Sequence, residues 1–242
     1  MDAMSARPVW ITIEIPRDAN SGVYTTDVTL KAKNGFSETL QLSLDIIDRV
    51  LPPASEWVYH LDLWQHPSSV ARVENVEPWS DEHFRLMDPT MKMLAEAGQK
   101  VITVNLNKDP WNNQTYDPYA DMIIWKKLEN GSWEYDYSVF DRWVEYMLGI
   151  GITKYINCYS MIPWNNELHY LDMATGETVN IVAEPTTPAF GELWTPFLVN
   201  FTEHLRQKGW LTFTNIAMDD RSDERMAAAT DTLAEQAHGV GT

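Results

Sequence analysis

Residues 57–237 repeat one pattern four times, in which an apolar strand is followed by a polar loop and then by a helical segment. Strands that alternate with helices favour a parallel sheet, because each helix returns the chain to the edge where the next strand starts. Four such units predict an α/β fold, the first half of a (β/α)8 (TIM-like) barrel, with an open doubly wound sheet as the alternative. The expected strands are 57–63, 100–105, 154–161 and 211–218, and the expected helices are 80–97, 138–148, 193–208 and 223–237.

The first fifty residues follow a different pattern, which is typical of antiparallel strands. Residues 9–15 alternate between apolar and other side chains, as in a half-buried strand. Two further strands are expected over 23–32 and 39–47, and Asn34-Gly35 between them is a strong hairpin signal. Three strands are too few for a sandwich, where about seven are usual. We therefore expect part of an antiparallel β-sandwich.

The segment Leu51-Pro52-Pro53 breaks the strand pattern and marks a domain boundary. Residues 1–52 are predicted to be the C-terminal part of a β-sandwich domain, and residues 53–242 the N-terminal half of the barrel. The chain is accordingly expected to be a fragment of a longer protein. A short hairpin is also predicted inside the barrel region, at 122–137.

Charge and composition restrict the partners. The net charge of −17 repels phosphate backbones, which argues against nucleic acid. No apolar run approaches the ~18 residues that span a bilayer, so no membrane partner is expected. No signal peptide is visible, and localisation stays open because an export signal of a periplasmic or extracellular parent would lie upstream. The chain has eleven tryptophans and ten tyrosines, and several lie in polar loops, where flat rings pack well against sugars.

The single cysteine, Cys158, excludes an intramolecular disulfide and cannot alone make a structural zinc site. It lies in an apolar stretch, which favours a buried inert thiol over a nucleophile. The sequence contains no nucleophile elbow, no phosphate-binding loop and no Cys/His metal signature. We expect neither a cofactor nor a metal.

Candidate functional residues follow the expected strands, because parallel barrels carry their chemistry at the carboxyl ends of the strands. The four clusters, in chain order, are His60, Asp62 and Trp64; Asn105, Asn107, Asp109 and Trp111; Tyr159, Ser160, Trp164 and Asn165; and Asp219, Asp220 and Arg221.

The last cluster is the sharpest, since two carboxylates directly follow a strand. In extended backbone, neighbouring side chains point to opposite sides, so Asp219 and Asp220 would have different environments. Glycosidic cleavage needs such a pair, with one acid protonated and the other charged. The alternative is that both acids only begin a loop and cap the next helix. Arg221 is placed to hold one of them ionised.

His60 and Asp62 are spaced to share one side of a strand, where they could hold a sugar hydroxyl. A metal pair is the alternative, although no third ligand stands at a suitable spacing.

The segment 208–221, with Lys208-Gly209-Trp210 at its start and Ile216-Ala217-Met218-Asp219-Asp220-Arg221 at its end, resembles the catalytic segment of glycoside hydrolase family 123. Those enzymes are exo-acting N-acetyl-β-galactosaminidases. Further similar segments are 22–24, 51–52, 131–138, 158–165 and 201–205. The resemblance thus spans nearly the whole chain.

The resemblance implies a β-sandwich ahead of a (β/α)8 barrel, and a retaining mechanism in which the 2-acetamido oxygen of the sugar attacks C1 to give an oxazolinium ion. The family motif is Asp-Glu. By position, Asp219 would orient the acetamido group and Asp220 would stand in the acid/base place. Aspartate is one methylene shorter than the family's glutamate, which departs from the pattern.

The resemblance also implies a glycan partner that ends in β-linked N-acetylhexosamine, and the expected sugar is N-acetylgalactosamine. Two alternatives stay open: a carbohydrate-binding barrel with impaired catalysis, and a (β/α)-barrel hydrolase for another β-linked sugar. The oligomeric state is not indicated. The residues expected to contact the sugar are His60, Asp62, Trp64, Asn105, Trp111, Tyr159, Trp164, Asn165 and Arg221.

Overall fold

The computed structural model of the chain describes residues 8–218 and 220–236. The chain divides into two compact units, Met1–Pro53 and Ala54–Thr242. Each unit is considered by itself.

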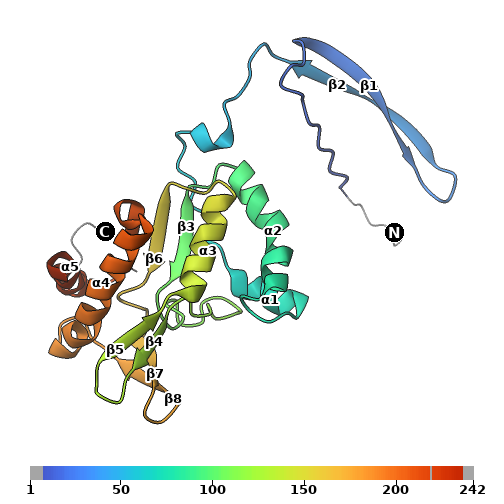
Figure 1. The fold of residues 1–242 in the computed structure, drawn as a ribbon. Helices are drawn as coiled ribbons and strands as arrows, with labels where there is room; N and C mark the ends of the chain where they lie inside the picture. Colours follow the sequence, from blue (N-terminus) through green and yellow to red (C-terminus); the bar gives the residue numbers. More distant parts are fainter. Residues whose placement is uncertain (1–7, 219, 237–242) are drawn as a thin grey trace. The chain divides into compact units, whose positions relative to one another are not determined.

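The first unit contains an antiparallel hairpin of β1 (Gly22–Lys31) and β2 (Ser37–Ile46), with Gly22 opposite Ile46 at one end and Lys31 opposite Ser37 at the other (Figure 1). Gly35 takes a φ of +88° in the turn, which explains why Asn-Gly predicts the hairpin well. The third expected strand, over 9–15, is wrong, because these residues pair with no described neighbour. Apolar side chains on the hairpin, such as Val23 and Leu40, remain exposed.

The second unit is built on a parallel sheet. Within the described residues this sheet has the order β3-β6-β9, made of β3 (Val101–Asn105), β6 (Tyr155–Tyr159) and β9 (Thr214–Ile216). Val101 lies opposite Tyr155, and Ile156 lies opposite Thr214. The mixed α/β class is confirmed, whereas these strands form an open sheet and no closed barrel in the described part of the chain.

The first expected strand of this unit, 57–63, forms only a single parallel bridge between Leu61 and Gln99. Side-chain amides replace the rest of the ladder. The Gln99 amide accepts from the Leu63 N–H (2.9 Å) and donates to the Leu63 carbonyl (3.1 Å). The Gln65 side chain also replaces a ladder bond further along the segment, because its Oε1 accepts from the Thr103 N–H (2.8 Å). The segment therefore lies beside β3 without regular strand geometry.

Five α-helices are described in the second unit. They are α1 (Pro67–Glu74), α2 (Asp81–Glu96), α3 (Ser138–Gly149), α4 (Pro188–Lys208) and α5 (Asp223–Gln236), with short 3-10 helices η1 (Ala54–Glu56) and η2 (Leu211–Phe213). The expected α2, α3, α4 and α5 are present, α4 starting earlier than predicted. Helix α1 falls where a loop was expected, and η2 takes the first residues of the expected strand 211–218.

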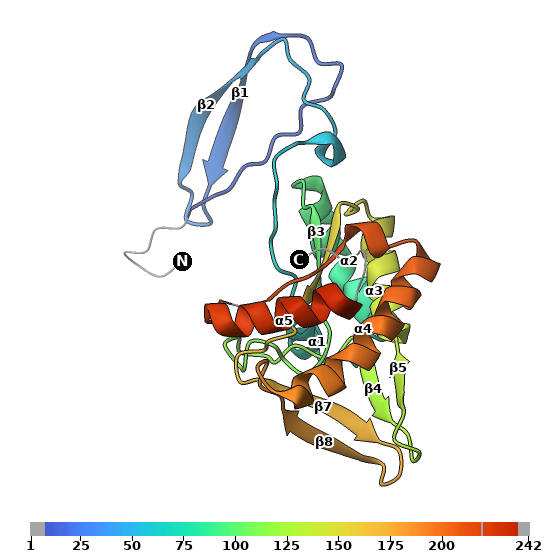
Figure 2. The same cartoon turned by 90° about the vertical axis from the view of Figure 1, so that its left-hand side faces the viewer.

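One face of the parallel sheet is the main core. Ile102, Ile156 and Ile216 on the strands pack with buried side chains of the helices, among them Trp143 of α3 and Phe201 of α4. Helix α5 adds Ala229 and Leu233 to this core and lies beside α4 (Figure 2). Each large side chain buried on this apolar face contributes about 1.5–3 kcal/mol to stability.

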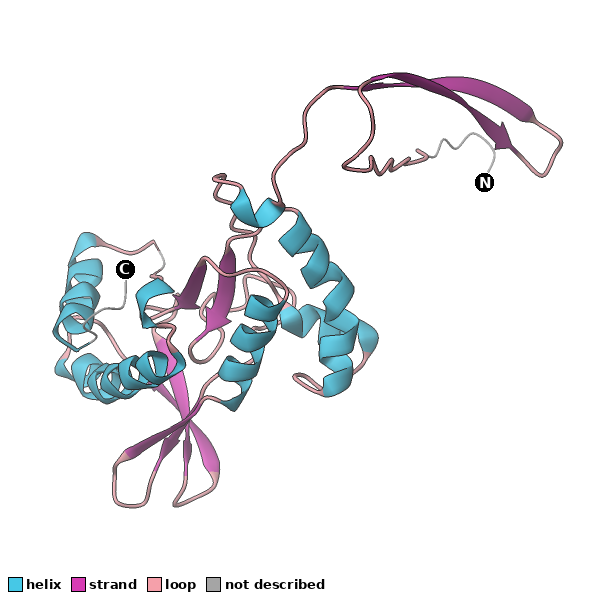
Figure 3. Cartoon of the chain, turned by 45° about the horizontal axis from the view of Figure 1, so that its top comes forward, coloured by secondary structure: helices cyan, strands magenta, loops and turns pink. Residues whose placement is uncertain are grey.

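A second sheet stands apart from the parallel one. Among the described residues this sheet has the strand order β5-β4-β7-β8. Its strands are β4 (Ile124–Lys127), β5 (Trp133–Asp136), β7 (Glu167–Asp172) and β8 (Glu177–Val182). Figure 3 shows the two hairpins side by side. The hairpin of β4 and β5 is predicted correctly, and the hairpin of β7 and β8 lies where a long loop was expected.

None of the helices in the described ranges is long and apolar enough to cross a membrane.

Candidate functional site

Aromatic rings from two loops and from the end of β6 meet where the parallel strands end. We call Trp64, Trp111, Tyr119 and Tyr159 the aromatic cluster. Trp64 lies 5.0 Å from Trp111 and 5.1 Å from Tyr159, and Trp111 lies 4.4 Å from Tyr119, between ring centroids. Trp111 and Tyr159 are buried, whereas Trp64 is 50% exposed. The cluster presents one accessible indole on a rigid aromatic base, an arrangement suited to the apolar face of a sugar.

The loop after β6 connects this cluster to the end of β9. The Trp164 N–H donates to the Pro110 carbonyl (2.9 Å), directly beside Trp111. On the other side, the Arg221 guanidinium lies 4.6 Å from the centre of the Trp164 ring and donates to the Pro163 carbonyl. The cation–π contact fixes Arg221 against the loop. Three strand ends thus meet at one edge.

Of the two candidate acids, Asp219 lies outside the described residues. Asp220 is exposed and precedes Arg221, which the contacts above anchor at the strand-end edge. Asn165, also a candidate, donates from Nδ2 to Asn112 Oδ1 (3.1 Å) and so links the loop after β6 to the loop after β3.

Two candidate asparagines after β3 hold other loops in place. Asn105 is fully buried, and its Nδ2 donates to the Ala120 carbonyl (3.2 Å). Asn107 accepts from the His169 N–H (2.8 Å) and donates to the His169 carbonyl (3.0 Å). The two amides therefore position the loop of residues 106–121 and the β7–β8 hairpin.

His60 and Asp62 belong to the segment 57–63. They lie on the face of the parallel sheet opposite the main core, farther from the carboxyl ends of the strands than the aromatic cluster. Burial raises the pKa of Asp62, while the charge of His60 and hydrogen bonds with Asn157 and Gln99 oppose the rise. His60 lines a pocket of about 350 Å³ together with Asn157 and Asn215, whose side chains are hydrogen-bonded to each other (3.0 Å). This face of the sheet is polar, unlike the core face.

A further pocket, of about 340 Å³, opens between the loop 106–121 and the β7–β8 hairpin. Its wall includes the ion pair of Lys108 with Glu167 and a hydrogen bond between His169 Nε2 and Asp121 Oδ2 (2.6 Å). Asp121 and His169 were not anticipated from the sequence. Their signal was present in the alternation of residues 167–182 around a turn at Gly176, which indicates a hairpin.

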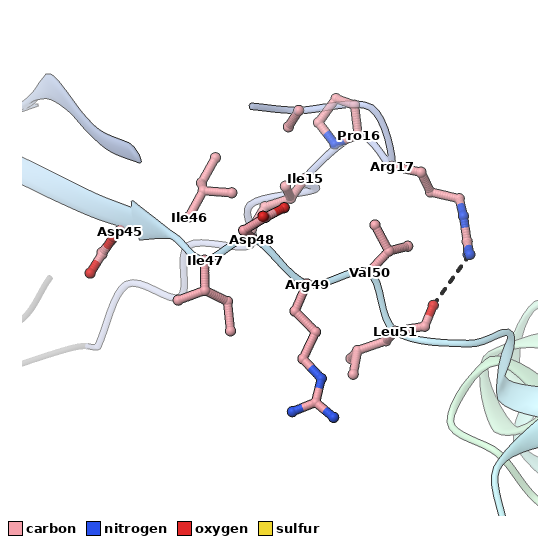
Figure 4. A pocket seen from close by; sticks show the side chains of 11 residues that line it. Ile15, Pro16, Arg17, Asp45, Ile46, Ile47, Asp48, Arg49, Val50 and Leu51 are labelled. Carbon is pink, nitrogen blue, oxygen red and sulfur yellow. Dashed lines mark hydrogen bonds between the residues drawn. The ribbon is translucent and has the colours of Figure 1, made fainter. Parts of the chain in front are cut away.

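Other pockets carry less chemistry. One in the first unit, of about 350 Å³, lies between residues 15–19 and 45–51 and is lined largely by apolar side chains, with Arg17 donating to the Leu51 carbonyl (Figure 4). Another, of about 410 Å³, is formed around Trp57 and Lys100, at the opposite end of the parallel strands from the aromatic cluster. Neither is lined by residues that follow a strand of the parallel sheet.

Cys158 is fully buried in the main core, and burial raises the pKa of its thiol, as expected for an inert cysteine. Among the described residues no group of three His, Cys, Asp or Glu side chains is placed to hold a metal ion.

Comparisons with known proteins agree on one family. A family model of the glycoside hydrolase 123 catalytic domain matches residues 64–242, and a model of the glycoside hydrolase 123 N-terminal domain matches residues 1–32. The solved structure of a family 123 glycoside hydrolase from Clostridium perfringens, described for its glycolipid glycan hydrolysis, is similar with a TM-score of 0.87 and 32% identity. The match covers 91% of this chain and 40% of that one, so this chain spans two fifths of that relative's length. No curated protein matches.

Proposed function

The chain belongs to glycoside hydrolase family 123, and on that basis we propose that it carries the acid pair of an enzyme that removes terminal β-linked N-acetylhexosamine from glycans. The observation that supports this most is the meeting of the aromatic cluster with the Arg221–Trp164 contact at one edge of the parallel sheet. A sugar bound on Trp64 lies near the chain segment that contains Asp219 and Asp220. The relative's action on glycolipid glycans and the family resemblance favour N-acetylgalactosamine as the terminal sugar.

The fold proposed for the whole enzyme is a (β/α)8 barrel that follows a β-sandwich along the chain. The segment 61–63, β3, β6 and β9 would be its first four strands, and the rest of a longer chain would supply the others. The polar face with Asn157 and Asn215 would then line the barrel interior. Residues 1–52 would be the last part of the sandwich and residues 53–242 the first half of the barrel.

The proposed reaction needs no enzyme nucleophile. The acetamido oxygen of the substrate forms a bond to C1 while the glycosidic bond breaks, and the Asp220 carboxylic acid gives its proton to the leaving oxygen. The Asp219 carboxylate holds the acetamido N–H and stabilises the positive charge of the oxazolinium ion. Water then attacks C1, Asp220 takes the proton from that water, and the acetamido group is restored with net retention.

The length of Asp220 affects the rate. Aspartate reaches about one methylene less far than the family's glutamate, and a misplacement near 1 Å costs on the order of 10²-fold. We therefore propose that this enzyme is slower than relatives with glutamate at this position.

Turnover of nitrophenyl N-acetyl-β-galactosaminide and of nitrophenyl N-acetyl-β-glucosaminide by the protein that contains this chain tests the proposal. Asp219→Asn should remove most activity, and Asp220→Glu should raise it or leave it intact. Asp231→Asn, an exposed aspartate on α5, is the matched control and should have no effect. Loss of turnover in Asp220→Glu would show that the acid/base role belongs to another residue.

One observation favours a second function. Because Asp220 stands where the family has glutamate, a carbohydrate-binding protein with impaired catalysis is the alternative. That protein would bind N-acetylhexosaminides without turnover, and Asp220→Glu would not restore it. Turnover of β-galactosides that lack the acetamido group would instead indicate a hydrolase for another sugar.

A further inference from the structure

We propose that the pocket between the loop 106–121 and the β7–β8 hairpin is the subsite for the sugar that remains after cleavage, and that it selects a neutral pyranose over an anionic one. This inference rests on the proposed function, since it assigns a place to the leaving part of the same substrate. The pocket, of about 340 Å³, is large enough for a small ligand.

The pocket adjoins the aromatic cluster. Tyr119 lines it and contacts Trp111 of the aromatic cluster. Asn165 lines the other side and follows Trp164, whose ring carries the Arg221 guanidinium. A disaccharide with its terminal sugar on Trp64 can therefore extend into this pocket along one loop surface.

One buried carboxylate in the pocket wall, that of Asp109, has a hydrogen-bond partner on only one of its two oxygens among the described residues. Asp109 is 9% exposed, and its Oδ2 accepts from the Asn113 N–H (2.7 Å). Among the described residues its Oδ1 has no hydrogen-bond partner. A buried carboxylate oxygen without a donor is costly, so a donor that reaches it is favoured. Because the last torsion of aspartate is soft, Oδ1 can turn towards a sugar hydroxyl placed in the pocket.

Other charged and polar groups of the wall bond to one another. Lys108 is bonded to Glu167 and also to Asn180 (3.1 Å), and His169 is bonded to Asp121. Burial, reinforced by the charge of Asp109, raises the pKa of Tyr119 to about 12, so its hydroxyl stays protonated at neutral pH. The wall therefore offers the negative charge of Asp109, which no cation of the wall contacts in the described structure, and a neutral hydroxyl.

This charge balance determines the ligand. A pyranose hydroxyl donates to Asp109 in a charge-assisted hydrogen bond. A sulfated or carboxylated sugar would place a second negative charge beside the buried Asp109 carboxylate, and like charges at such short range repel each other. The chain's net charge of −17 acts in the same direction.

Binding to the protein that contains this chain tests the subsite without catalysis, because probes without an acetamido group cannot enter the proposed reaction. The probes are methyl β-galactopyranoside and its 3-O-sulfate, titrated by NMR. Asp109→Asn keeps an acceptor for the Asn113 N–H but removes the charge, and should weaken the neutral probe by about tenfold, as expected for one charge-assisted hydrogen bond. Asp172→Asn is the matched control, because Asp172 also accepts a turn N–H, from Ala174 (2.8 Å), and is not part of the pocket wall.

The expected result is binding of the neutral probe, no binding of the sulfate, and full affinity in Asp172→Asn. Equal binding of both probes, or unchanged affinity in Asp109→Asn, would overturn the proposal. If thermal melting shows that Asp109→Asn does not fold, Tyr119→Phe replaces it, because it keeps the ring against Trp111. Unchanged affinity in Tyr119→Phe would equally overturn the proposal.

Turnover separates this inference from the proposed function. The ratio of kcat/KM for a disaccharide of N-acetyl-β-galactosamine on galactose to kcat/KM for the nitrophenyl substrate should fall about tenfold in Asp109→Asn and stay unchanged in the control Asp172→Asn. An unchanged ratio with normal nitrophenyl turnover removes the subsite and leaves the hydrolase. No turnover of either substrate by the wild-type enzyme removes the hydrolase itself.

Discussion

Asn107→Ala should detach the β7–β8 hairpin from the end of the parallel sheet. Strand β4 pairs with β7 only at Leu171 and Asp172, and the ladder ends before His169. There the Asn107 side chain takes the place of a peptide group, with an acceptor for the His169 N–H at 2.8 Å and a donor to its carbonyl at 3.0 Å. Alanine removes both partners at once.

The magnitude follows from these two bonds. Asn107 is 3% exposed, so both bonds are shielded on its side. Each backbone group left without a partner costs about 1–3 kcal/mol, and the partial exposure of His169 lets water recover some of that. We expect the free energy of unfolding to fall by about 2–4 kcal/mol. At about 2–4 °C per kcal/mol for a domain of this size, Tm should fall by roughly 5–15 °C.

Urea unfolding measures the stability, and hydrogen exchange of the His169 amide measures the local bond. The matched control is Asn180→Ala on β8, an exposed asparagine that accepts a hydrogen bond from Lys108 and should cost less than about 1 kcal/mol. A loss below about 0.5 kcal/mol in Asn107→Ala, with unchanged exchange at His169, would refute the view that this amide completes the ladder.

Two further predictions concern stability. Gly98→Ala should lower the free energy of unfolding, measured in urea, by about 1–3 kcal/mol. The reason is that Gly98 has a φ of +88° and that a Cβ there would meet the Trp57 ring at 2.9 Å. An unchanged free energy of unfolding would mean that the backbone relaxes. Burial raises the pKa of Asp141, but hydrogen bonds from His204 and Lys208 outweigh it, so the folded pKa is below the usual 3.8. This carboxylate therefore stabilises the fold above that pH and ceases to do so as the pH falls through the lower folded value, and Asp141→Asn should flatten the loss of stability measured between about pH 5 and about pH 2.5.

Local signals in the sequence predict the helices well. Ser80 caps α2 by accepting from the His83 N–H (3.2 Å), and Gly209 ends α4 with a φ of +75°. Both features act within a few residues, so the sequence carries them directly. The start of α4 is missed because residues 188–192 look like loop, whereas Phe190 is held in the core by packing.

The strands depend on partners that the sequence does not reveal. Residues 57–63 have an apolar strand pattern, but Gln99 and Gln65 take the backbone bonds with their side chains. Residues 9–15 alternate well and find no partner strand among the described residues. In both cases the pattern predicts burial on one face, while strand pairing is decided by distant residues.

The candidate site shows the same difference between features that the sequence predicts and features that depend on distant residues. Trp64, Trp111 and Tyr159 lie together because parallel strands bring their carboxyl ends to one edge, a consequence of topology that the alternation of strands and helices already implies. Asp121 and His169 were missed because their contact needs the hairpin held by Asn107, and that hairpin was expected to be a loop although the alternation of residues 167–182 indicates it. The roles of Asp219 and Asp220 rest on the family and on position, and they remain proposals.

The most direct test of the central claim is the rate of hydrolysis of nitrophenyl N-acetyl-β-galactosaminides whose acetyl group carries none, one, two or three fluorine atoms. Fluorine withdraws electrons from the acetamido oxygen and weakens it as a nucleophile without changing the leaving group. If that oxygen attacks C1, log kcat/KM must fall steeply along the series in the enzyme that contains this chain. A flat series with full turnover would contradict substrate-assisted catalysis and would require a different role for Asp219.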